Sequence, residues 1–362
     1  MTNTDGTRRG AGAPLRRLAA LIGCIVCLAA APSQAHAEWY SRTQAIMDTR
    51  IYVELWDTSP QHANAAIDAV MAEMHHVDDV MSDFKPDSQL SRINEHAAQH
   101  PVVVSPELYD LIRLSTHYSR ITDGAFDITV ESVWRLYHFR RHIHPTDAEI
   151  EALLPTVNWR NLILDDRRHS IRFARPGMAI GLGGIAKGYA VDRSIDILKA
   201  MGIRHAIVTA GGDSRLLGDH RGRPWMVAIM DPWDLHKVVT RVPLSNEAIS
   251  TSGDYYRGFV QNGVRYDHIL SPLTGHSAQL VRSASIIAPT ATQTDGMSKT
   301  AFILGPQKTL ALIDRMPQYD AILICPDGRV VYSKGMAPPP GGPPPAPAAE
   351  SPSANASGIS GQ

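Results

Sequence analysis

The segment from 179 to 192, AIGLGGIAKGYAVD, has the residues of an anion-binding loop. The glycines that allow a tight turn and a close approach to a ligand are Gly181, Gly183 and Gly184. A helix beginning near Ala186 would add unpaired N–H groups and a partial positive charge. Lys187 stands in the first turn of that helix, where a positive charge is unfavourable unless an anion such as a phosphate lies nearby. The segment predicts a phosphate site; the alternative is a glycine turn with a solvated lysine.

The letters GLGGIA also match the dinucleotide pattern G-x-G-x-x-G/A, which requires a parallel strand–helix–strand unit. The surrounding sequence predicts hairpins instead, one of them from 161–164 and 170–173. After an apolar strand at 205–210, further strands are expected at 225–230, 238–242, 248–251, 256–260 and 264–270. Asn262-Gly263, a typical hairpin turn, joins the last two. Serial hairpins indicate antiparallel pairing, so the sequence argues against a nicotinamide- or FAD-binding Rossmann oxidoreductase.

Three elements ahead of the loop must position it. The run MDTRIYVELW at 47–56 is rich in β-branched and aromatic residues and predicts a strand. Apolar residues recur at three- and four-residue spacing from about 61 to 81, which predicts a helix with one buried face. Ser105 and Pro106 are a capping residue and a first helical residue, so a second helix should run to about Thr122.

The whole chain has 362 residues, 44% of them hydrophobic, and a formal net charge of −1. No global positive charge indicates binding to nucleic acid or to an anionic membrane surface. Residues 1–37 have the arginines, the apolar run and the Ala35-His36-Ala37 site of a cleaved signal peptide. Residues 337–362 are mostly Pro, Ala, Gly and Ser and predict a disordered tail. One folded domain at 38–336 remains, in which Cys325 is the single cysteine and an expected core residue.

The glycine segment is one of five motifs that follow one another between about Met47 and Gly305. The others are TDGAFDITV at 122–130, AGGD at 210–213, ISTSGDYYR at 249–257 and HILSPLTG at 268–275. Together they resemble the ApbE family of FAD:protein FMN transferases. The resemblance implies an α+β fold with mixed, largely antiparallel sheets flanked by helices. It also implies that FAD is bound with Mg²⁺ on its pyrophosphate, and that FMN passes to a Ser or Thr hydroxyl of a target flavoprotein with release of AMP.

The resemblance also assigns roles to single residues. His268 matches a histidine near the pyrophosphate and is the candidate proton acceptor, because an imidazole titrates near neutral pH. The positions that match contacts to flavin and adenosine, together with the loop lysine, are Met47, Phe84, Ala125, Phe126, Asp127, Gly181, Lys187, Ser252, His268 and Ile269. The positions that match the metal site are Gly184, through its carbonyl, Asp295, Ser298 and Lys299.

The sequence departs from the family pattern at three of these positions. Gly181 stands where an Asp is common, Phe84 where a Tyr is frequent, and Lys299 where a Thr hydroxyl often binds magnesium. An ammonium cannot ligate a cation, so Lys299 could pair with Asp295 in the metal's place. The other hypothesis, which we favour from sequence, is that Ser298 and the Gly184 carbonyl complete an oxygen site beside a displaced lysine.

Three functions therefore remain open from sequence. The first is a periplasmic FMN transferase acting on a flavoprotein of an exported or membrane redox system. The second is an FAD pyrophosphatase that gives FMN and AMP, and the third is an exported flavin-binding protein without turnover. In each case FAD is the expected ligand, nucleic acid is not a partner, and the mature chain is expected to have no transmembrane helix.

Overall fold

The computed structural model describes residues 1–2, 37–255 and 258–336. The predicted tail lies outside the described residues, as does the predicted signal peptide apart from Met1, Thr2 and Ala37. Tyr256 and Arg257, at the end of the ISTSGDYYR motif, lie outside them too.

An eight-stranded sheet forms the centre of the domain, with the strand order β1-β2-β6-β7-β10-β13-β14-β15. Its strands are β1 (Glu38–Ile46), β2 (Thr49–Asp57), β6 (Ala206–Ala210), β7 (Asp213–Leu217), β10 (Ala248–Gly253), β13 (Ser283–Ala288), β14 (Asp320–Ile324) and β15 (Val330–Tyr332). Each neighbouring pair among these described strands is antiparallel. The predicted α+β class with largely antiparallel sheets is thus confirmed.

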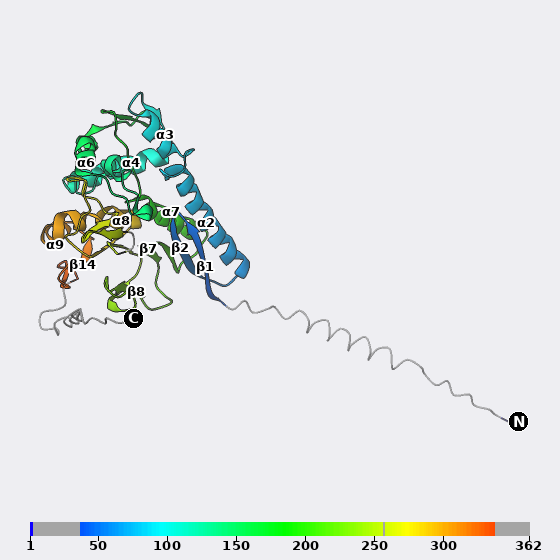
Figure 1. Ribbon diagram of the computed structural model, residues 1–362. Helices are drawn as coiled ribbons and strands as arrows, with labels where there is room; N and C mark the ends of the chain where they lie inside the picture. Colours follow the sequence, from blue (N-terminus) through cyan, green and yellow to red (C-terminus); the bar gives the residue numbers. More distant parts are fainter. Residues whose placement is uncertain (3–36, 256–257, 337–362) are drawn as a thin grey trace, which may run out of the picture.

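The two faces of the large sheet are covered by different elements. Successive side chains of a strand point to opposite faces, so Ala321 and Leu323 join the main core while Ile322 and Ile324 join a second one. The second core is closed by the hairpin of β8 (Trp225–Met230) and β9 (Val238–Leu244). The main core is closed by helices, among them α2 (Pro60–Met81) and α7 (Ala186–Ala200), which pack against each other. Figure 1 shows α2 lying along β1 and β2.

Helices α2 and α4 (Pro106–Ile121) start where the sequence predicts. Ser59 and Ser105 cap them through their hydroxyls, and each has proline in its first turn. The shorter helices are α3 (Gln89–His96), α5 (Glu131–Trp134), α6 (Asp147–Leu153), α8 (Ala291–Ser298) and α9 (Thr300–Ile313), with 3₁₀ turns at Ile128–Val130, Phe139–Arg141, Leu154–Thr156 and Trp159–Asn161. None of the helices in the described ranges is long and apolar enough to cross a membrane.

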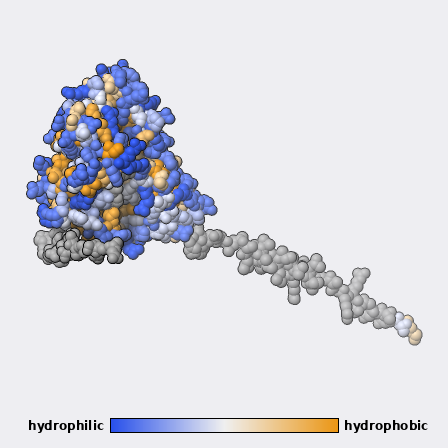
Figure 2. All heavy atoms as spheres, in the orientation of Figure 1, coloured by the Kyte–Doolittle hydropathy of each residue, from blue (hydrophilic) through white to orange (hydrophobic). Residues whose placement is uncertain are grey.

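Two smaller sheets carry the loops around the candidate site. The first orders β3 (Val102–Val103), β5 (Ser170–Phe173) and β4 (Leu162–Asp165), which confirms the predicted hairpin. The second pairs β11 (Gly258–Gln261) with β12 (Val264–Asp267). Asn262 and Gly263 join them with φ values of 52° and 78°, as a type I′ turn requires. The molecular face in Figure 2 is mostly hydrophilic, with apolar residues in separate patches.

Candidate active site

Asp295, on helix α8, is the centre of the candidate site. Thr290 and Gln293 form a capping box at the start of this short helix, which fixes its position. The Asp295 carboxylate is fully buried and accepts hydrogen bonds from Lys299 Nζ, from Lys187 Nζ at 3.3 Å and from the Gly188 N–H at 3.0 Å. Burial alone would raise the pKa of Asp295, but the charges of Lys187 and Lys299 outweigh burial and hold it below the ordinary value.

Lys187 stands in the first turn of α7, as predicted, and its nearest anions belong to the protein. Its ammonium pairs with the carboxylates of Asp213 and Asp295. Burial would lower its pKa, but these two carboxylates raise it above the usual value, so the lysine is charged. The alternative of a solvated lysine is therefore wrong, since 24% of the side chain is exposed and its charge is paired.

Asp213 reaches Lys187 because the AGGD turn is pressed against two neighbouring strands. A Cβ on Gly212 would lie 2.3 Å from the Thr251 carbonyl oxygen. Gly211, at φ 63°, would place a Cβ 2.6 Å from Thr49 Oγ1. Only glycine allows both approaches. The sequence motif contained Asp213, but sequence analysis did not assign it to the site, because the strand order that brings it to Lys187 is not visible in the sequence.

The four residues predicted as metal ligands come together at the end of α8. Lys299 Nζ bonds Asp295 Oδ1 and lies 3.4 Å from both the Asp295 carbonyl oxygen and Ser298 Oγ. A Cβ on Gly184 would lie 3.6 Å from Lys299 Cδ, which places the glycine loop against the lysine side chain. Ser252, a predicted cofactor contact at the end of β10, lies 2.8 Å from Ser298 through the two hydroxyl oxygens.

Helices α7 and α8 are held together by the remaining residues of the glycine segment. A Cβ on Gly188 would lie 2.2 Å from the Ala291 carbonyl oxygen, so the close contact requires glycine. Asp192 accepts hydrogen bonds from the backbone N–H groups of Ala291 and Thr292, both at 2.8 Å. These contacts fix Lys187 relative to Asp295, and sequence analysis missed this structural role of Asp192.

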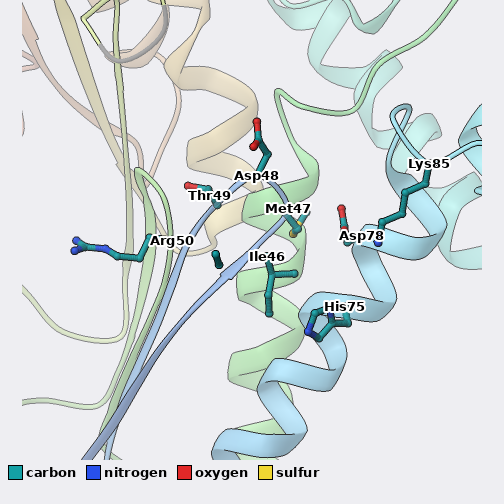
Figure 3. Close-up of a pocket in the computed structure, with 9 residues that line it drawn as sticks. Ile46, Met47, Asp48, Thr49, Arg50, His75, Asp78 and Lys85 are labelled. Atoms are coloured by element: carbon teal, nitrogen blue, oxygen red, sulfur yellow. Dashed lines mark ion pairs between the residues drawn. The ribbon is translucent and has the colours of Figure 1, made fainter. Parts of the chain in front are cut away.

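A cavity of about 530 Å³ lies between the β1–β2 turn and helix α2. It is lined by Ala45, Ile46, Met47, Asp48, Thr49, Arg50, His75, Asp78 and Lys85. Figure 3 shows Ile46 and Met47 at the hairpin end beside α2, from which His75 and Asp78 project, while Arg50 points away from that helix. Met47, a predicted flavin contact, thus lines this cavity, and Thr49 of the same lining lies against Gly211 of the AGGD turn.

Phe84 and His268 belong to a second group of predicted residues, joined through Trp134. Phe84 is 73% exposed, and its ring stands edge-on to Trp134 with centroids 6.2 Å apart. Trp134 Nε1 donates to the His268 carbonyl oxygen at 3.0 Å. Ile269 is buried, and its N–H donates to Asp267 Oδ1 at 2.9 Å. The predicted stacking surface at Phe84 is therefore accessible to a ligand.

The TDGAFD turn contacts the glycine loop through Phe126. This ring is buried, as is Ala125, and a Cβ on Gly184 would lie 3.3 Å from Phe126 Cε2. The Asp127 carboxylate is used inside the fold: it accepts hydrogen bonds from the N–H groups of Thr129 and Trp159, both at 2.9 Å. Its predicted contact with a ligand stays a prediction.

Gly181 lies against a carboxyl group supplied by another element. A Cβ on Gly181 would lie 2.4 Å from Glu131 Oε2, so no larger residue fits while Glu131 holds its position. Burial and the neighbouring Asp83 raise the pKa of Glu131 well above its ordinary value. The Glu131 carboxyl thus occupies the space that a side chain at 181 would need. Sequence analysis missed it, because the two positions are 50 residues apart along the chain.

Asp267, beside His268, is a fully buried carboxyl group. Burial raises its pKa to about 7, although the hydrogen bond from the Ile269 N–H acts to lower it. Its Oδ2 atom has no hydrogen-bond partner among the described residues. The raised pKa favours the protonated form of this carboxyl group beside the candidate base.

A family model for the ApbE family matches residues 47–323, which include both groups of candidate residues. The chain belongs to the ApbE family. The FAD:protein FMN transferase of Treponema pallidum is 32% identical over 333 residues, which cover 86% of this chain and 92% of that protein. The FAD:protein FMN transferase of Vibrio cholerae is 33% identical over 255 residues, covering 68% and 75%.

Solved structures of ApbE proteins are similar in fold. The ApbE protein of Thermotoga maritima aligns with a TM-score of 0.76 and 31% identity, covering 82% of this chain and 98% of that one. The flavin transferase ApbE of Vibrio cholerae aligns with a TM-score of 0.73 and 28% identity, covering 83% and 98%. The predicted family and fold are both confirmed.

Proposed function

We propose that this chain is an FAD:protein FMN transferase. The observation that carries the proposal is the meeting of two ammonium groups, those of Lys187 and Lys299, at the start of helix α7 beside a glycine loop. Donors at a helix N-terminus and fixed positive charges are what a pyrophosphate needs, because its transfer depends on charge stabilisation. The relatives from Treponema pallidum and Vibrio cholerae are themselves named FAD:protein FMN transferases.

The reaction exchanges one P–O bond for another. The hydroxyl oxygen of a Ser or Thr on the acceptor flavoprotein attacks the FMN phosphorus of FAD, and AMP leaves with the electron pair of the broken bond. His268 is our candidate to accept the hydroxyl proton. Lys187 and Lys299 would donate to the pyrophosphate oxygens on which negative charge develops. Met47 and the exposed Phe84 would contact the flavin ring.

Magnesium was the finer part of the sequence-based prediction, with Asp295, Ser298 and the Gly184 carbonyl as its ligands. The arrangement of these residues does not fit a divalent cation, because the Lys299 ammonium lies on the oxygens that the cation would use. We therefore assign the charge stabilisation to the protein's own donors.

The proposal includes export to the periplasm, supported by the signal-peptide features of residues 1–37. The acceptor would then be a flavoprotein of an exported or membrane redox system. Its identity does not follow from the residues of this chain.

The transfer can be tested with a membrane fraction from a strain of the source organism that lacks the gene for this protein. The fraction is incubated with FAD and the mature protein. We expect a new band with in-gel flavin fluorescence that survives denaturation, and AMP in solution. AMP without a flavinylated band would favour the pyrophosphatase, and neither product would favour the flavin-binding protein without turnover. Omitting the added enzyme is the control for flavoproteins that were already modified.

A further inference from the structure

The ammonium of Lys299 is placed as a bound cation would be. It contacts Asp295 Oδ1, the Asp295 carbonyl oxygen and Ser298 Oγ, three oxygens from two neighbouring residues. The lysine follows Asp295 by four positions, so the turn of helix between them holds the pair together. Asp295 is fully buried, whereas 20% of the Lys299 side chain is exposed. The Lys299 ammonium is thus bound to a buried carboxylate on one side and accessible to a ligand on the other.

A divalent ion could enter only by displacing this ammonium. Mg²⁺ requires close contact, at about 2.0–2.1 Å, with oxygens in near-octahedral geometry. Both Asp295 oxygens already accept hydrogen bonds, from Lys299, Lys187 and the Gly188 N–H. A further carboxylate at the site, that of Asp213, is itself paired with Lys187. An incoming ion would meet two like charges, and displacing Lys299 would break its pairing with a buried carboxylate.

We propose that Lys299 is a tethered cation that takes the place of the divalent ion at the FAD pyrophosphate. This inference rests on the proposed function, since it concerns how that same site neutralises its substrate. It adds that this chain binds FAD and transfers FMN without a divalent metal.

The hydrogen-bonding capacity of the ammonium agrees with this role. A lysine ammonium has three N–H donors, and the one close partner of Lys299 among the described residues is Asp295 Oδ1. Its other two contacts, at 3.4 Å, lie at the limit of hydrogen bonding and can be exchanged for stronger bonds to phosphate oxygens.

The net charge of the site differs between a bound ammonium and a bound divalent ion. Lys187, Lys299, Asp213 and Asp295 sum to zero, so the pyrophosphate meets donors and the helix N-terminus rather than a net positive field. A divalent ion in place of the ammonium would add one further positive charge. We therefore expect Lys299→Thr, which removes the ammonium and supplies a hydroxyl, to make FAD binding depend on Mg²⁺.

Titration of the mature protein with FAD, followed by flavin fluorescence in EDTA and in excess Mg²⁺, tests the inference. The wild-type Kd should differ by less than about threefold between the two conditions. Lys299→Thr should weaken binding in EDTA by at least about tenfold and regain most of it in Mg²⁺. The matched control is Lys199→Thr, since Lys199 is an exposed lysine paired with Asp196 on α7 and should leave both Kd values unchanged.

A wild-type Kd that rises tenfold or more in EDTA would overturn the inference, as would a Lys299→Thr protein that binds FAD in EDTA like the wild type. If that variant does not fold, the wild-type titration and the Lys299→Met variant still show whether FAD binding depends on Lys299 or on Mg²⁺. Failure of the proposed function has a different signature: no flavin reaches an acceptor with or without Mg²⁺. Transfer that occurs only with Mg²⁺ would refute the tethered cation and keep the transferase.

Discussion

At the scale of single residues, the site depends on a few buried charges that satisfy one another. Asp295 is buried only because Lys187, Lys299 and the Gly188 N–H neutralise it. Removing one member would leave an unpaired charge in the interior, which costs more than the pair itself contributes. FAD must therefore bind by sharing donors that the protein already uses.

His268→Ala tests the candidate base. We expect turnover to fall by roughly 10² to 10⁴-fold, because the attacking hydroxyl loses its proton acceptor. FAD affinity should stay nearly unchanged, since the charges that bind the pyrophosphate remain. Single-turnover transfer and an FAD titration measure the two effects. His276→Ala, an exposed histidine of the following loop, is the control. An equal loss in affinity would make His268 a ligand-positioning residue.

Asp267 should make stability depend on pH. Its folded pKa of about 7 lies above the ordinary value of 3.8, so the folded state binds the extra proton between these values. The free energy of unfolding should therefore be highest below about pH 4 for this group and fall as the pH rises to about 7. Integration between these two pKa values gives a loss of about 4 kcal/mol.

Asp267→Asn should remove this part of the pH dependence and stabilise the protein at pH 8 relative to the wild type. Urea unfolding of both proteins between pH 4 and pH 8 measures it, and the difference between them cancels the other titrating groups. Parallel curves for the two proteins would show that Asp267 is ionised in the fold throughout this range.

At the scale of the element, the β1–β2 turn combines backbone strain with a predicted ligand contact. Met47 and Asp48 both have positive φ, 55° and 53°, in a two-residue turn where Asn and Gly are preferred. A left-handed conformation costs a non-glycine residue about 1–2 kcal/mol. Met47 also lines the cavity beside α2, where a long apolar side chain can contact a ligand. This predicted contact would explain why the turn keeps a strained methionine.

Met47→Asn should therefore raise the free energy of unfolding by about 1 kcal/mol while weakening FAD binding about fivefold. Chemical denaturation and FAD titration measure the two opposite changes. Gln318→Asn is the control, because Gln318 has φ 72° and is exposed outside the site, so it should stabilise the fold without affecting FAD. Tighter FAD binding by Met47→Asn would contradict the predicted flavin contact.

Elements with strong local signals were predictable from the sequence. The apolar period of α2, the Ser-Pro start of α4 and the Asn262-Gly263 hairpin each depend on neighbouring residues and were found. Strand β1 was missed, because polar and charged residues interrupt its sequence EWYSRTQAI. It pairs with β2 along its whole length, and that contact stabilises it as a strand.

At the scale of the molecule, strand order decides what the site contains. β6 lies beside β2 and β10 lies between β7 and β13, which brings Asp213 and Asp295 to Lys187 across 26 and 108 positions of sequence. The family resemblance predicted Lys187 and Asp295, but neither periodicity nor spacing could pair Lys187 with Asp213, or Gly181 with Glu131. Such contacts arise from tertiary packing and leave no local pattern.

Signal-peptide cleavage would change the N-terminus of the whole domain. Cleavage after Ala37 would leave Glu38, the first residue of β1 and the partner of Asp57, as the new N-terminus, so the large sheet would stay intact. Mass spectrometry of the protein purified from its source organism should find an N-terminal peptide that begins EWYSR. Ala37→Leu should block that cleavage. A mature chain that begins at Cys24 or retains Met1 would contradict it.

The ratio of AMP released to flavin bound covalently on the acceptor distinguishes transfer of FMN from hydrolysis of FAD. Both products come from breaking the same P–O bond, so we expect one AMP for each flavin attached, with purified acceptor, FAD and the mature chain in EDTA-treated buffer or in Mg²⁺. AMP and free FMN in equal amounts, with no flavin on the acceptor in either buffer, would contradict the account and identify a hydrolase.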